Sequence, residues 1–274
     1  MMLYPEGPHF SNNYLFWTDY LSNKIHKLNI VTFESSFIEL APEYSGATSI
    51  LISDNIMFIC CYDSHKLLEL NMTTNQIVYE YDIPYPNDMC FDDLGGIYIT
   101  SSARRTQKDP FNVESKATGN IYYKNKNRII TNMHIHPSIY YANGIVYSKK
   151  YNMVYVSEHL HNRILSFKVS SGVALYHRKV LYELPEYLNI PLLGPDGLAL
   201  DDPEEFLYIA HFGSGNLIKY SFKSMAICVY ECPFENVTNV ALSKEKKAIA
   251  VTVANDGESP GCVMLCVNGV VRTI

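Results

Sequence analysis

The sequence lacks the features that mark several common classes of protein. No stretch of it approaches the roughly 18 consecutive apolar residues of a membrane-spanning helix. Its start, MMLYPEGPHF, has neither the basic nor the apolar segment of a secretory signal. The seven cysteines show no C-x-x-C spacing, and Cys60 and Cys61 are adjacent. These absences predict a cytoplasmic protein with free, mostly buried thiols, outside the membrane and without a disulfide framework.

Runs of one charge are also missing. The net charge of −6 is spread along the chain, and no cluster of Lys and Arg offers a surface for nucleic acid. The G-x-S-x-G motif of many serine hydrolases is absent. Long amphipathic helical patterns are absent too, apart from a weak candidate at 241–247. We therefore expect an all-β protein that binds no nucleic acid.

What the sequence does contain is a repeat of paired strands. Each copy has an apolar β-type run, a turn with Asn, Gly or Ser, and a second run, and most copies follow a shorter apolar strand. The copies recur about every 40 to 55 residues, which is close to the length of a β-propeller blade. They lie at 14–29, 55–71, 95–125, 152–167, 206–222 and 247–269.

This repeat predicts one domain, residues 1–274, folded as an all-β, six-bladed β-propeller with four-stranded blades around a central channel. A β-sandwich is the alternative, but sandwich strands do not group so regularly. No linker rich in Pro, Gly or Ser divides the chain. The segments 103–118 and 184–194 are the least regular, and we expect them to be loops that overhang one end of the channel.

Polar residues precede the inner strands at a common position in the repeat. Asn87, Asn143 and Asp196 are separated by 56 and 53 residues, and Glu6 lies 81 residues before Asn87. Because the innermost strands of a propeller line its channel, these carboxylates and carboxamides should converge at one mouth. Grouped oxygen donors suit Ca²⁺, Mg²⁺ or Mn²⁺. The alternative is that they are ordinary turn residues, since Asn, Asp and Gly are common in turns.

The same residues carry a resemblance to a known family. The chain resembles the gluconolactonase family, which includes regucalcin (senescence marker protein) and drug-responsive lactonases, over nearly its whole length. The segments that carry the resemblance, in the family's order, are EGPHF (6–10), PNDMCFDDLGGIYIT (86–100), ANGIVYS (142–148), GPDGLALDD (194–202) and AHFGSGNLIKY (210–220).

The resemblance implies a hydrolase that opens a sugar-type or other small lactone with one divalent cation in the channel. Calcium is the first candidate for that cation, and Mg²⁺, Mn²⁺ and Zn²⁺ are alternatives. By motif match, Glu6, Asn143 and Asp196 would bind the metal, and Asn87 would face the metal or the substrate. The cation would polarise the lactone carbonyl, and Asp196 is the candidate base for the attacking water.

Two positions depart from the family pattern. Ser101 stands where many relatives have Asp, and Tyr85 stands where sugar lactonases often have Arg, which suggests a substrate less polar than gluconolactone. His211 is either an acid or substrate contact in the channel or a buried core histidine. The departures keep open a second hypothesis, a propeller that binds a ligand or a protein partner without chemistry. A lyase or synthase on a similar propeller is a third.

Overall fold

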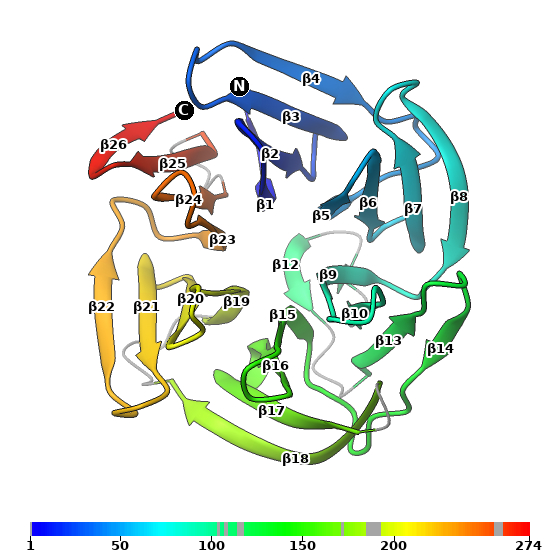
Figure 1. The fold of residues 1–274 in the computed structure, drawn as a ribbon, viewed down its shortest axis with the longest axis vertical. Helices are drawn as coiled ribbons and strands as arrows, with labels where there is room; N and C mark the ends of the chain where they lie inside the picture. The colour runs from blue at the N-terminus through cyan, green and yellow to red at the C-terminus, as the bar shows by residue number, and fades with distance from the viewer. Residues whose placement is uncertain are drawn as a thin grey trace.

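The predicted propeller is confirmed. The computed structural model describes residues 2–102, 105–106, 109–113, 118–170, 173–184, 193–254 and 260–274. Six four-stranded antiparallel sheets stand around a common axis as blades (Figure 1). Within each blade the strands follow one another along the chain from the axis to the rim, except that the hairpin β11–β12 is inserted in the third blade.

Each blade therefore contributes one strand to each of four concentric layers. The innermost strands are β1 (Pro5–Ser11), β5 (Ala47–Ser53), β9 (Pro86–Phe91), β15 (Ala142–Ser148), β19 (Gly194–Leu200) and β23 (Val237–Ser243). The second strands are β2 (Tyr14–Asp19), β6 (Ile56–Cys61), β10 (Ile97–Ser101), β16 (Met153–Glu158), β20 (Phe206–Phe212) and β24 (Ala248–Val253). The third strands are β3 (Lys24–Asn29), β7 (Lys66–Asn71), β13 (Asn120–Lys124), β17 (Arg163–Ser170), β21 (Asn216–Ser221) and β25 (Cys262–Val267). The outer strands are β4 (Ser35–Glu39), β8 (Gln76–Asp82), β14 (Ile130–Asn132), β18 (Ala174–Glu183), β22 (Ile227–Glu231) and β26 (Val270–Thr273).

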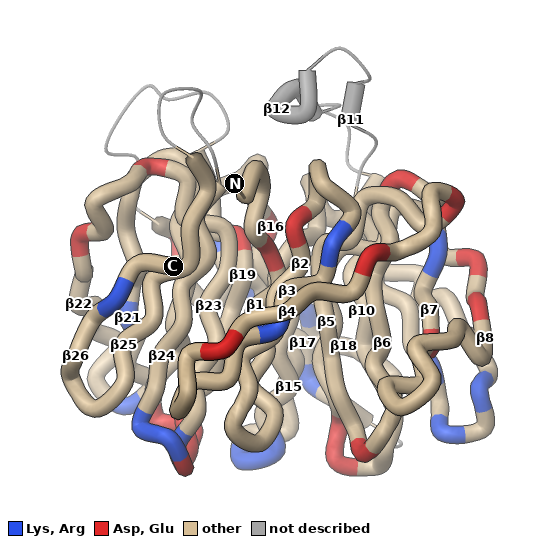
Figure 2. Tube along the Cα trace, turned by 90° about the horizontal axis from the view of Figure 1, so that it is seen from above, with Lys and Arg blue, Asp and Glu red and all other residues tan. Residues whose placement is uncertain are grey.

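The core lies between the blades. Successive residues of a strand point to opposite faces of its sheet, so a blade packed between two neighbours needs apolar residues on both faces. The second strands meet this need and are almost wholly buried, whereas the outer strands are mostly exposed. Between the second and third blades, for example, Leu51 and Phe58 belong to one cluster with Met89 and Ile99. Charged residues of both signs are distributed over the loops and the rim (Figure 2).

The ring closes by contact between the first and last blades, which exchange no strand. Trp17 of β2 packs with Val263 and Leu265 of β25. The hydroxyl of Thr238 donates a hydrogen bond of 2.8 Å to the carbonyl oxygen of Pro5. Closure therefore depends on apolar packing and on a hydrogen bond beside Glu6, at the axis.

Two details of the sequence prediction need correction. The expected helical candidate at 241–247 is wrong, because residues 241–243 end β23 and the chain then turns, with the amide of Lys247 donating to the carbonyl of Lys244 at 3.1 Å. The segment 103–118 contains the short hairpin β11 (Arg105–Thr106) and β12 (Asp109–Val113). The remainder of that segment, and most of 184–194, lie outside the described residues.

A buried ion pair joins the second and third blades. Lys124 Nζ of β13 lies 3.1 Å from Glu69 Oε1 of β7, and the two residues are 5% and 2% exposed. Tyr81 donates to the same carboxylate at 2.7 Å, and Arg128 Nε lies 3.3 Å from its other oxygen. Burial opposes the charge of Glu69, but the hydrogen bonds from Tyr81 and Lys124 and the neighbouring cations outweigh it and lower the pKa of Glu69.

The cysteines are free, as expected. Cys60, Cys61 and Cys262 are buried, Cys228 is exposed, and the other three are half-buried. Burial raises the pKa of Cys61 to about 12, so its thiol stays protonated and behaves as a small apolar group. Within the described residues, no helix has the length and apolarity needed to cross a membrane.

Candidate functional site

The polar residues expected at the channel mouth occupy equivalent positions on four of the inner strands. Glu6, Asn87, Asn143 and Asp196 each lie at the second or third residue of their strand. They are 5%, 6%, 3% and 4% exposed. The other two blades have threonines at this position. The six residues, Glu6, Thr48, Asn87, Asn143, Asp196 and Thr238, are called the channel ring below.

A β-bulge accompanies every member of the channel ring. In each blade, the pairing between the inner and second strands shifts register at this level. A bulge inserts an unpaired residue and re-aims side chains, and bulges are frequent next to functional sites. The same register shift therefore recurs in each blade around the axis. With regular pairing, the side chains at this level would stay between the blades.

Buried hydroxyl groups fix the backbone at the channel ring. Each hydroxyl belongs to one blade and donates to a carbonyl oxygen of the next, so it ties neighbouring blades together at the axis. The hydrogen bonds run from Thr48 to Asn87 (2.7 Å), from Thr100 to Asn143 (2.7 Å), from Ser157 to Asp196 (2.7 Å) and from Thr238 to Pro5 (2.8 Å). None of these four residues was expected from the sequence. For Thr100 and Ser157 the visible signal is a Ser or Thr near the end of the second strand, as in IYIT and VYVS, whereas Thr48 and Thr238 lie on inner strands.

Close packing of the inner strands explains why Gly follows Glu6, Asn143 and Asp196. A Cβ on Gly144 would lie 2.3 Å from the backbone oxygen of Asp196. Gly7 has a φ of +48°, and a Cβ there would lie 2.5 Å from the Cα of Ser49. Only glycine tolerates such approaches without movement of the neighbouring strand. The Glu-Gly, Asn-Gly and Asp-Gly pairs thus reflect blade packing at the axis.

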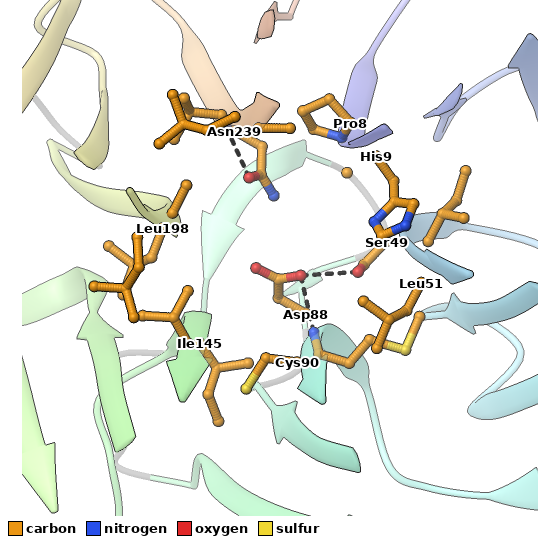
Figure 3. A pocket seen from close by; sticks show the side chains of 18 of the residues that line it. Pro8, His9, Ser49, Leu51, Asp88, Cys90, Ile145, Leu198 and Asn239 are labelled. Carbon is orange, nitrogen blue, oxygen red and sulfur yellow. Dashed lines mark hydrogen bonds between the residues drawn. The ribbon is translucent and has the colours of Figure 1, made fainter. Parts of the chain in front are cut away.

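Asn87 is followed by an acidic residue, and this carboxylate enters the channel. Asp88 Oδ1 accepts hydrogen bonds from the Ser49 hydroxyl and from the amide of Met89, both at 2.8 Å. Figure 3 shows Asp88, Ser49 and Asn239 pointing into one cavity, together with the ring of His9. The cavity has a volume of about 210 Å³ and continues the channel along the inner strands.

The electrostatics of this channel favour a cation. Burial raises the pKa of Asp88 to about 6, so the carboxylate still carries most of its charge at neutral pH. Burial also lowers the pKa of His9 to about 4, which keeps that imidazole neutral. Among the described residues that line the cavity there is no Lys or Arg. Uncompensated negative charge in a low-dielectric channel attracts positive ions.

The donor set at the channel ring fits a hard cation only if amide oxygens take part. Among the described residues, no three His, Cys, Asp or Glu side chains lie close enough together to hold a metal ion by themselves. The ring offers two carboxylates, from Glu6 and Asp196, and two carboxamides, from Asn87 and Asn143. Carboxylate and amide oxygens together are the ligands typical of Ca²⁺.

Comparison with known proteins identifies the family. Residues 4–255 match the family model described as the SMP-30/Gluconolactonase/LRE-like region. The chain belongs to this family. No curated protein sequence matches it significantly.

Solved structures with the same fold include several members or neighbours of this family. A luciferin-regenerating enzyme is 18% identical with a TM-score of 0.78, and the match covers 100% of this chain and 94% of that one. Calcium-binding regucalcin from Agrobacterium tumefaciens is 22% identical with a TM-score of 0.76, over 94% and 84% of the two chains. A gluconolactonase from Xanthomonas campestris is 17% identical with a TM-score of 0.75, over 97% and 87%. These likenesses concern the fold.

Tyr85 and Ser101, the two departures that the resemblance led us to expect, lie close together in the structure. Tyr85 and Ser101 both line an open groove of about 420 Å³ beside the channel ring. Tyr85 is half-buried, and its ring centroid lies 5.5 Å from that of Tyr62 and 4.2 Å from that of His65. The hydroxyl of Ser101 donates to the carbonyl of Pro84 at 2.5 Å.

Aromatic side chains cluster at the end of the propeller that carries the channel ring. Tyr4, Tyr20, Tyr62 and Phe212 form one buried cluster, and Tyr85 packs against it. These residues come from four different inter-strand connections or strand ends, all at the end of the molecule that carries the channel ring. This cluster of aromatic side chains, called the aromatic collar, lowers the local dielectric constant. A lower dielectric constant strengthens interactions between the charges inside it.

His211 has the contacts of a buried core histidine. Its side chain is fully buried, with Nδ1 2.7 Å from the Ser214 hydroxyl and Nε2 2.8 Å from Asn162 Oδ1. Both ring nitrogens therefore have protein partners. Burial, together with the charge of His159, lowers the pKa of His211 to about 4. The geometry favours the core interpretation over an acid or a substrate contact.

The buried His211 is expected to make the stability of the protein sensitive to mild acid. Its pKa of about 4 lies below the 6.5 of an unperturbed histidine, so the unfolded chain takes up the proton first as the pH falls below 6.5. The stability contribution is complete above pH 6.5 and is lost towards pH 4, by about 3 kcal/mol. Urea denaturation at several pH values should show a weaker pH dependence in His211→Asn than in wild type. The exposed His177→Asn variant is the control, and equal slopes in all three proteins would contradict the prediction.

Proposed function

We propose that this protein is a divalent-metal-dependent hydrolase that opens a small lactone. The observation that carries the proposal is the channel ring, where two buried carboxylates and two buried carboxamides stand at one level of the channel. Membership of the SMP-30/gluconolactonase family supports it, as does the fold shared with a gluconolactonase from Xanthomonas campestris. The proposed partner is a small-molecule lactone, not a nucleic acid or a membrane, and the proposed location is the cytoplasm.

In this proposal Glu6, Asn143 and Asp196 hold the cation. Calcium is the first choice because the ligands are all oxygen atoms and because the structural neighbour regucalcin is described as calcium-binding. Mg²⁺, Mn²⁺ and Zn²⁺ are the alternatives. When bound, the cation would polarise the lactone carbonyl and stabilise the negative charge that develops on its oxygen.

The protein's own groups would do the remaining work. Asp196 takes a proton from the water that attacks the carbonyl carbon, and it returns this proton to the ring oxygen when the carbon–oxygen bond of the ring breaks. The product is a hydroxy acid. Asn87, whose backbone is held by Thr48, orients the substrate through its amide. The aromatic collar excludes bulk water, and the uncharged Tyr85 suits a substrate without a charge at this point.

Metal analysis combined with a lactone panel tests the proposal. We expect one divalent cation per chain in the purified protein and hydrolysis of at least one γ- or δ-lactone. A chelator should abolish this activity, and one of Ca²⁺, Mg²⁺, Mn²⁺ or Zn²⁺ should restore it. A folded protein that binds none of these ions and opens no lactone would overturn the proposal.

The substitutions at Tyr85 and Ser101 favour one second candidate, a propeller that binds a ligand without turning it over. It predicts a bound cation and measurable ligand binding with no hydrolysis of any lactone in the panel. The same experiment therefore separates the two. A lyase is a weaker candidate: virginiamycin B lyase from Staphylococcus aureus shares the fold at 15% identity and a TM-score of 0.65, over 100% of this chain and 86% of that one.

A further inference from the structure

A groove lies across one end of the third blade, next to the strand end that carries Asn87. Its inner end begins at Tyr85, two residues before Asn87. Ser101 of β10 pairs with Pro86 on one side and with Asn120 of β13 on the other, so these residues form one row across the blade. The groove has a volume of about 420 Å³, which falls in the size range of small-molecule sites. Its lining includes the side chains of Tyr85, Ser101, Thr118, Asn120, Tyr122 and Asn132.

The hydrogen bonds of two side-chain amides, those of Asn120 and Asn132, decide whether the groove presents donors or acceptors. Asn120 Oδ1 accepts from the amides of Ile121 (2.8 Å) and Ile135 (3.0 Å). These two bonds orient the amide and leave its Nδ2, a donor, for the groove. Asn132 Oδ1 accepts from the amide of His134 at 2.8 Å. The backbone therefore uses both lone pairs of the Asn120 oxygen and one lone pair of the Asn132 oxygen.

The phenol of Tyr122 adds a second donor. Its oxygen accepts a hydrogen bond of 3.1 Å from Asn132 Nδ2, which leaves its own proton to be donated. Thr118 is exposed at the edge and contributes another hydroxyl. Among the described residues that line the groove, none is charged. The groove thus offers N–H and O–H donors in a neutral setting.

We propose that this groove is a specificity subsite for an uncharged, oxygen-bearing substituent of the substrate, such as an ether, a hydroxyl or a carbonyl group. The proposal rests on the proposed function, because it assumes that the reacting lactone lies at the channel ring. Hydrogen-bond donors on uncharged side chains match hydrogen-bond acceptors that are themselves uncharged. Among the described residues of the groove an anionic substituent would find no counter-charge, and an alkyl chain would leave the donors of Asn120 and Tyr122 unpaired, which is costly. Tyr85 and Ser101, which also line the groove, are both uncharged.

Three γ-lactones with the same ring and substituents of similar length test the subsite. The substituents are methoxyethoxymethyl, which bears neutral oxygens, hexyl, which is apolar, and carboxypropyl, which is anionic. We expect kcat/KM in the order methoxyethoxymethyl, hexyl, carboxypropyl. A preference for the hexyl or the carboxypropyl lactone in the wild-type protein would overturn the proposal.

Variants of the two donors sharpen the test. Tyr122→Phe removes the phenolic proton, and Asn120→Asp removes the amide donor but keeps the oxygen that accepts from Ile121 and Ile135. Each should lower the ratio of kcat/KM between the methoxyethoxymethyl and hexyl lactones by about 5-fold, the worth of one hydrogen bond. Tyr147→Phe is the matched control, because the Tyr147 hydroxyl contacts Asp93 outside the groove. An unchanged ratio in both groove variants would contradict the subsite.

A binding experiment separates failure of the subsite from failure of the proposed function. The tetrahydrofuran analogues of the methoxyethoxymethyl and hexyl lactones lack the carbonyl group and cannot be hydrolysed. If no lactone is opened, NMR titration with these analogues still tests the groove. Tighter binding of the methoxyethoxymethyl analogue, weakened about 5-fold by Tyr122→Phe, would support the subsite even when the hydrolase proposal has failed. Equal binding of both analogues would overturn the subsite.

Discussion

Replacement of Asp196 by Asn is expected to reduce kcat/KM for lactone hydrolysis by about 100- to 10,000-fold, the range that a general base contributes. The change removes the proposed base and one of the two carboxylates of the channel ring, while the shape of the side chain is kept. Asp196 is 4% exposed, and the Ser157 hydroxyl holds its carbonyl oxygen at 2.7 Å. A neighbouring group therefore cannot easily move into its place. Steady-state kinetics at saturating metal would measure the loss, and metal analysis would show weaker binding of the cation.

A matched control and a second variant make this result specific. Asp202→Asn changes an exposed carboxylate of the same blade, which pairs with Lys244 at 2.7 Å, and should leave kcat/KM within about 2-fold. Glu6→Gln should weaken the binding of the cation, as Asp196→Asn does, but it leaves the proposed base in place. If Asp196→Asn folds, retains its cation and hydrolyses lactones at the wild-type rate, Asp196 is neither the base nor a ligand.

Replacement of Lys124 by Met is expected to destabilise the protein by about 3 to 5 kcal/mol, because removal of one member of a buried ion pair leaves an uncompensated charge. Glu69 is 2% exposed and would keep only the hydrogen bond from Tyr81 and the more exposed Arg128. Urea denaturation followed by circular dichroism would measure the free energy of unfolding.

Two comparisons separate the ion pair from a simple loss of packing. Lys66→Met breaks a surface pair, in which Lys66 Nζ lies 2.8 Å from Asp82, and should cost no more than about 1 kcal/mol. The double variant Glu69→Gln with Lys124→Met removes both charges and should recover part of the loss. Equal effects of Lys124→Met and Lys66→Met would show that the buried pair contributes no more than a surface one.

The sequence by itself determined the architecture and pointed to four of the six members of the channel ring, Glu6, Asn87, Asn143 and Asp196. Strands alternate with period 2, and turns have local residue preferences, so six copies of one strand pattern could be recognised without knowledge of contacts. The phase of Asn87, Asn143 and Asp196 within that repeat then placed them at the same end of equivalent strands. This reasoning works because a propeller converts spacing along the chain into position around an axis.

Only the tertiary structure decided how that ring is supported and what lies around it. The hydroxyls of Thr100 and Ser157 act on a neighbouring blade, and Lys124 meets a glutamate 55 residues away in the sequence. No local pattern records such contacts. The same holds for His211, whose two nitrogens find partners within a buried environment.

The groove of the third blade shows most clearly the difference between what the sequence determines and what the tertiary structure decides. The family resemblance drew attention to Tyr85 and Ser101, but their surroundings depend on Asn120, Tyr122 and Asn132, which reach the same place from later strands. Whether an asparagine presents a donor or an acceptor depends on which backbone amides already bind its oxygen. That is a property of packed strands in three dimensions, and strand periodicity carries no information about it.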